Sequence, residues 1–126
     1  MIVYKERYVK NAPSEEVEQI TFFNQLREHK PHLAAVATHI KNEGKRTPGQ
    51  VAVDKANGMV TGALDINIPG SPTLLIELKK RSKRAKVSDE QVAYAEAASA
   101  LGCHVYFCWG WEAAWEAVEE WESARR

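Results

Sequence analysis

Cysteine is scarce in this chain of 126 residues, which contains only Cys103 and Cys108. The two lie five positions apart in an apolar stretch. On a strand, that spacing points their side chains to opposite faces, where they cannot easily form a disulfide. A zinc site would need further ligands close by in the sequence, and none cluster there. We therefore expect two buried thiols rather than a disulfide or a zinc site.

Long hydrophobic runs are also missing. No apolar stretch approaches the roughly 18 residues that a membrane-spanning helix needs. The opening segment, MIVYKERYVK, lacks the basic-then-apolar order of a signal peptide. Hydrophobic residues make up 44% of the chain and charged residues 27%, an ordinary composition for a soluble domain. We expect a cytoplasmic protein with no membrane association, folded as a single domain over residues 1–126.

The chain has no net charge, with 17 basic and 17 acidic residues, but the charge is unevenly placed. The segment 112–122 is acidic, whereas the segment 79–86 is strongly basic. Such a basic run is either a solvated loop or a surface that binds phosphates. The residues that we expect to contact a nucleic-acid backbone are Lys80, Arg81, Lys83, Arg84 and Lys86.

The order of apolar and polar residues predicts an α/β fold with a mixed β-sheet flanked by helices. Ser14 and Ser88 stand where N-caps are expected, each followed by acidic residues. The expected helices cover residues 14–30, 50–56, 88–101 and 111–124. The expected strands cover residues 33–40, 63–68, 73–80 and 104–109, and residues 1–12 form a short strand or arm.

A β-hairpin made of the strands 63–68 and 73–80 carries the chemistry. Glu77 and Lys79 are two positions apart and so share one face of an otherwise apolar strand. Asp65 lies in the preceding strand, where the connecting turn brings it near Glu77. Two facing carboxylates repel each other unless a cation lies between them, and oxygen ligands suit Mg²⁺ or Mn²⁺. A surface salt bridge at the strand end is the simpler alternative for Glu77 and Lys79.

These residues resemble a known nuclease pattern. The series Asp65, eleven residues, Glu77-Leu78-Lys79 resembles the PD-(D/E)xK signature. Together with segments 39–44 (HIKNEG), 58–65 (GMVTGALD), 76–79 (IELK) and 88–91 (SDEQ), it resembles the VRR-NUC family over roughly residues 14 to 112. One position departs from the pattern, because Leu64 replaces the usual proline.

The resemblance implies a restriction-endonuclease-like core and a site dependent on Mg²⁺ or Mn²⁺. It assigns Asp65, Glu77 and the main-chain carbonyl of Leu78 as metal ligands and Lys79 as the catalytic lysine. It also implies a glutamate from the first helix, for which we favour Glu18 over the alternative Glu15.

The same resemblance places Gln91 at the active site, in contact with water or DNA. His39, Asn42 and Glu43 either touch substrate or serve as capping and turn residues. Stand-alone VRR-NUC proteins resemble Holliday-junction resolvases in being homodimers that cut branched DNA, and the resemblance implies a protein of phage or bacterial mobile-element type. A C-terminal helix carrying Trp111 and Trp115 is one hypothetical dimer interface, although core packing is the default for these aromatic residues.

The sequence thus predicts a metal-dependent endodeoxyribonuclease, selective for branched DNA such as Holliday junctions, in the cytoplasm of a bacterium or a phage-infected cell. Two alternatives remain. One is a catalytically idle DNA-binding or assembly module of the same fold, and the other is a nonspecific nicking nuclease with the same chemistry.

Overall fold

The structure is a computed structural model that describes residues 1–40 and 47–125. Its elements follow one another along the chain with these bounds: β1 Ile2–Lys5, α1 Glu15–His29, α2 Pro31–Ala34, β2 Thr38–His39, α3 Pro48–Ala56, β3 Ile66–Ile68, β4 Leu74–Lys79, α4 Asp89–Ala100, β5 His104–Trp109 and α5 Trp111–Ala124.

The strands form one mixed sheet in the order β1-β5-β4-β3-β2. β5 lies between β1 and β4 and is parallel to both, while β3 pairs antiparallel with β4 and with β2. β4 is therefore central, and it is the longest strand along with β5. The predicted mixed sheet and the predicted hairpin between β3 and β4 are both confirmed.

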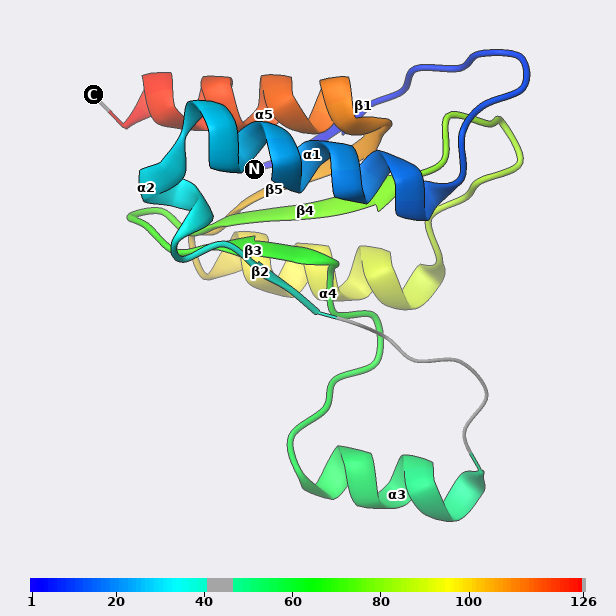
Figure 1. Ribbon diagram of the computed structural model, residues 1–126. Coiled ribbons are helices and arrows are strands. Elements are labelled where there is room, and N and C mark those ends of the chain that lie inside the picture. Colours follow the sequence, from blue (N-terminus) through cyan, green and yellow to red (C-terminus); the bar gives the residue numbers. More distant parts are fainter. Residues whose placement is uncertain (41–46, 126) are drawn as a thin grey trace.

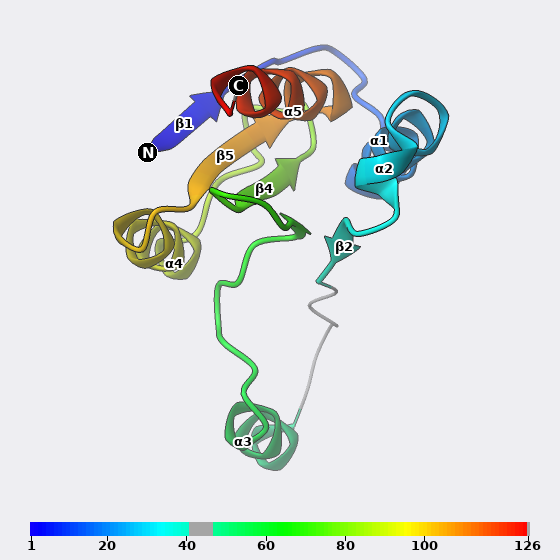
Figure 2. The same ribbon diagram turned by 90° about the vertical axis from the view of Figure 1, so that its left-hand side faces the viewer.

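Helices cover both faces of this sheet. α1 and α5 lie against one face and α4 against the other (Figures 1 and 2). β4 alternates between the two layers: Ile76 and Leu78 pack under α1 and α5, whereas Leu75 packs towards α4. The side chains of Glu77 and Lys79 follow the phase of Leu75, so they leave the strand on the α4 side.

The capping residues begin the helices where the sequence predicts. The Ser14 hydroxyl accepts a hydrogen bond from the Val17 N–H, which starts α1. Ser88 and Gln91 form a reciprocal capping box at the start of α4, each side chain accepting a hydrogen bond from the other residue's backbone N–H. These two caps fix the helix ends nearest the predicted site.

Two predicted strands differ from the structure. Residues 33–40 were expected to form a buried strand, but the segment contains the end of α2 and only the two-residue strand β2, both of whose residues are exposed. Leu33 is its one buried residue. The strand expected over residues 63–68 starts only at Ile66, and residues 63–65 precede it outside regular secondary structure. α3 stands apart from the sheet, and none of its residues is buried (Figure 1).

Both cysteines are free, as expected, but only one of the two is fully buried: Cys108 lies under α5, whereas Cys103 is half-buried against the opposite layer. Among the described residues, no helix combines the length and apolar character needed to cross a bilayer. The tryptophans of β5 and α5 mainly pack in the protein core. Trp121 and Trp109 are buried, with ring N–H groups donating to the carbonyls of Pro72 and Ala85.

Candidate active site

Asp65 and Glu77 face each other across the open end of the hairpin. Ile66 pairs with Ile76 in the β3–β4 ladder, and the next step of that register sets Asp65 opposite Glu77. The Asp65 N–H donates to Glu77 Oε1 at 3.2 Å, and the Leu78 N–H donates to Asp65 Oδ2, also at 3.2 Å. Each carboxylate is thus held by the other strand, and the predicted proximity of the two acids is present.

A third carboxylate comes from the first turn of α1. One carboxylate oxygen of each of Glu15, Asp65 and Glu77 lies within 4.8 Å of the others. Glu15 is exposed, Asp65 is half-buried and Glu77 is buried, so the cluster extends from the surface at Glu15 into the interior at Glu77. Three oxygen donors at this spacing fit a hard divalent cation such as Mg²⁺ or Mn²⁺.

The cluster is electrostatically strained when it holds no cation. Burial, followed by the charge of Asp65, raises the pKa of Glu77 to about 8. Burial also raises the pKa of Asp65, and burial together with the charge of Asp65 raises that of Glu15. Lys79 opposes all three shifts but does not cancel them. An added positive charge at this place would stabilise all three ionised groups.

Lys79 and Gln91 complete the site. The Lys79 ammonium lies 3.5 Å from Glu77 Oε2, and its side chain is largely buried. The Gln91 amide group donates to the same Glu77 oxygen at 3.0 Å, while its own oxygen accepts from the Ser88 N–H in the capping box. The capping box therefore aims the Gln91 amide at Glu77 and fixes the rotamer of that carboxylate.

Close packing at Gly62 sets the distance between α4 and the segment leading into Asp65. Gly62 has a φ of +85°, and a Cβ atom there would lie 2.3 Å from the Glu90 carbonyl oxygen. Only glycine fits this conformation and this contact without a shift. The sequence alone does not reveal Gly62 as a site-forming residue, because its role depends on a contact with a distant helix.

The prediction for Glu18 requires correction. Its carboxylate lies outside the cluster, is buried, and accepts a hydrogen bond from Arg81 Nε at 2.7 Å and one from the Trp111 N–H at 3.5 Å. Glu15, the alternative, occupies the place beside Asp65. The aliphatic part of Arg81 packs directly on Gly110, where a Cβ would lie 2.4 Å from it. Glu18 therefore joins α1 to the end of β4 and the start of α5.

The basic loop after β4 consequently divides into two kinds of residue. Arg81 is engaged with Glu18 and is not a free phosphate contact, contrary to the expectation for it. The other four residues of the predicted surface are exposed: Lys80, Lys83, Arg84 and Lys86. The Lys83 ammonium lies 5.9 Å from the centre of the Tyr8 ring. The loop follows the strand end that carries Lys79, on the same side of the molecule as the start of α1 (Figure 1).

Three other expectations concern His39, the pair Asn42 and Glu43, and the main-chain carbonyl of Leu78. His39 lies in β2 opposite Ile66, the neighbour of Asp65, so it borders the carboxylate cluster. Asn42 and Glu43 lie outside the described residues. The Leu78 N–H takes part in the site through Asp65, whereas the role of its carbonyl as a metal ligand stays a prediction.

This fold is similar to that of a protein of known structure. No protein-family model matches the sequence, and no curated protein matches it. A solved structure described as a VRR_NUC domain protein superposes on this one with a TM-score of 0.72, covering 86% of this chain and 87% of that one at 19% sequence identity. The chain has the fold of a VRR_NUC domain. An identity of 19% shows the architecture alone, so the activity rests on the residues of the site.

Proposed function

We propose that this protein is a divalent-metal-dependent endonuclease that hydrolyses phosphodiester bonds in DNA. The observation that carries the proposal is the cluster of Glu15, Asp65 and Glu77, with the Lys79 ammonium beside it, in a VRR_NUC fold. A carboxylate cluster repels the phosphates of nucleic acid unless it holds a cation. A purely DNA-binding module would therefore gain nothing from this arrangement.

The residues present fit Mg²⁺ or Mn²⁺, held by Glu15, Asp65 and Glu77, with the Leu78 carbonyl as a further oxygen donor. Such an ion supplies Lewis-acid polarisation of the phosphate and lowers the pKa of bound water. Lys79 stabilises negative charge that develops on the phosphate oxygens and orients the attacking water. Gln91 is a positioning residue, because it reaches the site by holding the Glu77 carboxylate.

The substrate proposal extends to branched DNA, with the exposed lysines and Arg84 of the 80–86 loop contacting the phosphate backbone. A homodimer would place two such sites across a four-way junction. α5 does not support the dimer interface that the sequence suggested, because its Trp121 is buried and both Trp111 and Trp115 pack against the core. The dimer is thus proposed without that helix, and sedimentation at micromolar concentration tests it.

A panel of labelled DNAs tests the activity: four-way junctions, flaps, nicked and plain duplexes, each incubated with Mn²⁺ and then with Mg²⁺. We expect cleavage that requires the metal and is fastest on a branched substrate. In the Asp65→Asn variant, cleavage should be lost while DNA binding is kept. Equal cleavage of plain duplex supports a nonspecific nicking nuclease, and no cleavage by the wild type with either metal supports the idle module.

A further inference from the structure

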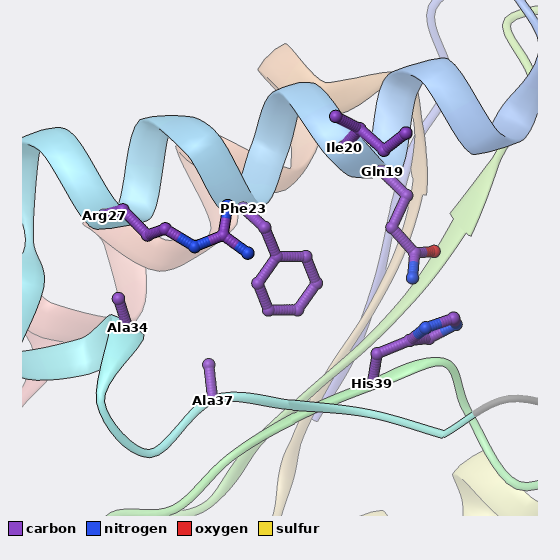
Figure 3. A pocket seen from close by; sticks show the side chains of 7 residues that line it. All are labelled: Gln19, Ile20, Phe23, Arg27, Ala34, Ala37 and His39. Carbon is purple, nitrogen blue, oxygen red and sulfur yellow. The ribbon is translucent and has the colours of Figure 1, made fainter.

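A hollow lies beside the carboxylate cluster, and of the residues placed near the site so far only His39 lines it. It has a volume of about 370 Å³ and lies between α1 and the segment that runs from α2 into β2. Figure 3 shows the Phe23 ring projecting from α1 into this space, above the small side chain of Ala37. Its volume lies within the range of small-molecule sites.

The lining combines an aromatic surface with polar groups at its ends. Phe23 is half-buried, its ring held edge-on against the Phe22 ring at a centroid distance of 5.5 Å. Ala34 and Ala37 are small, so they leave room beside the ring. The exposed Arg27 guanidinium reaches towards one side of the ring (Figure 3). It donates a 2.8 Å hydrogen bond to Asn24 Oδ1.

The other end of the hollow borders the proposed metal site. Gln19 lies one helical turn after Glu15, and its amide points towards the His39 ring (Figure 3). His39 pairs with Ile66, and the next residue, Ile40, donates its N–H to the Asp65 carbonyl oxygen at 2.6 Å. The aromatic surface therefore lies one turn of α1 from Glu15, and its His39 end lies one residue from the hydrogen bond between Ile40 and Asp65.

We propose that this hollow holds one unpaired nucleobase next to the scissile phosphate, an inference that rests on the proposed nuclease function. Phe23 offers its ring for stacking, Gln19 offers an amide that can donate to and accept from a base edge, and Arg27 contacts a neighbouring phosphate. A base inside a duplex cannot reach such a recess without leaving the stack. The site therefore favours DNA with an unpaired nucleotide at the cut, as at a flap, a bulge or a branch point.

The test first maps the cleaved phosphate in the best substrate of the panel. The nucleotide on each side of it is then replaced in turn by an abasic residue or by 2-aminopurine, and affinity is measured with Ca²⁺ in place of the catalytic ion. For the wild type we expect abasic replacement at one of these positions to weaken binding by about five- to 150-fold. 2-Aminopurine at that position should lose fluorescence on binding.

Three variants separate stacking from other effects. Phe23→Leu should bind the intact and the abasic DNA alike, and Phe23→Tyr should keep the wild-type difference. Tyr94→Leu is the matched control, because Tyr94 is a half-buried aromatic that lines a separate hollow beside α4. It should also keep the difference. Arg27→Gln should weaken binding of both DNAs by a similar factor.

The outcomes distinguish failure of the proposed base site from failure of the proposed nuclease activity. A wild type that cuts branched DNA but binds intact and abasic substrates equally overturns the base site and leaves the nuclease proposal standing. Unchanged 2-aminopurine fluorescence at both positions leads to the same conclusion, and it needs no variant. Failure of the wild type to cut any DNA counts against the nuclease itself.

Discussion

Replacing Glu15 and Glu18 separately by glutamine tests the division of labour between two glutamates one helical turn apart. The structure places Glu15 in the carboxylate cluster and Glu18 in an ion pair with Arg81. Glutamine keeps the size of the side chain and one acceptor oxygen but removes the charge. We therefore expect Glu15→Gln to change metal binding and Glu18→Gln to change stability.

The size of the Glu18 effect follows from its burial. The Glu18 side chain is 2% exposed and that of Arg81 is 21% exposed, with 2.7 Å between Oε2 and Nε. Breaking a fully buried pair costs about 3–5 kcal/mol, and water that reaches Arg81 reduces this to about 2–3 kcal/mol. For a domain of this length, that loss corresponds to a fall in melting temperature of roughly 6–15 °C.

Glu15→Gln should leave stability nearly unchanged and weaken metal binding, the reverse of what we expect for Glu18→Gln. It relieves repulsion from Asp65, which offsets the loss of a favourable helix-terminus charge worth about 0.3–1 kcal/mol. Stability should therefore change by less than about 1 kcal/mol, while Mn²⁺ affinity falls at least about tenfold. Thermal denaturation in EDTA and titration calorimetry with Mn²⁺ measure the two effects, with Glu16→Gln, an exposed neighbour, as the control. A Glu18→Gln variant with wild-type stability and no Mn²⁺ binding would refute this reasoning.

Two further predictions concern the frame of the site and its charge. Gly62→Ala should lower the free energy of unfolding by about 2–3 kcal/mol and weaken Mn²⁺ binding, because its Cβ meets the Glu90 carbonyl. Gly58 also has a positive φ, but a Cβ there would meet nothing within 4 Å. Gly58→Ala should therefore lose less stability and keep the affinity for Mn²⁺. The raised pKa values of Glu15, Asp65 and Glu77 mean that the metal-free fold holds protons that the unfolded chain has released, so its stability should fall as the pH rises from about 5 to about 8. Melting temperatures in EDTA and in Mn²⁺ should therefore diverge as the pH rises, and parallel curves would contradict the assignment.

The parts of the fold that sequence reasoning predicts correctly are those governed by local chemistry. β5 and α5 have the predicted bounds, and Ser14 and Ser88 cap the helices as expected. Alternation along β4 correctly separates Glu77 and Lys79 from Ile76 and Leu78. Each of these features depends on hydrogen bonds or periodicity within a few residues, which a sequence shows directly.

The sequence-based predictions are wrong where contacts between residues far apart in the chain determine the structure. Residues 33–40 are rich in alanine and valine, a composition typical of a buried strand, but the segment lies at the sheet edge, where β2 is short and exposed. The choice between Glu15 and Glu18 could not be made from the helix alone, because the two are only about 60° apart around its axis. The position of Arg81, on a loop more than sixty residues later in the chain, decides it.

Arg81 also shows how the fold keeps the site's charges apart. It follows Lys79 by two residues, yet its guanidinium turns away to Glu18, and among the described residues it is Lys79 that pairs with Glu77. Were Arg81 directed into the cluster, its charge would neutralise a carboxylate and compete with a divalent ion for the same oxygens. By pairing with Glu18, it holds α1 against the end of β4 and thereby brings Glu15 to Asp65. The residual negative charge of the cluster is therefore preserved by an ion pair that lies outside it, and that charge is what makes the site suited to a divalent metal.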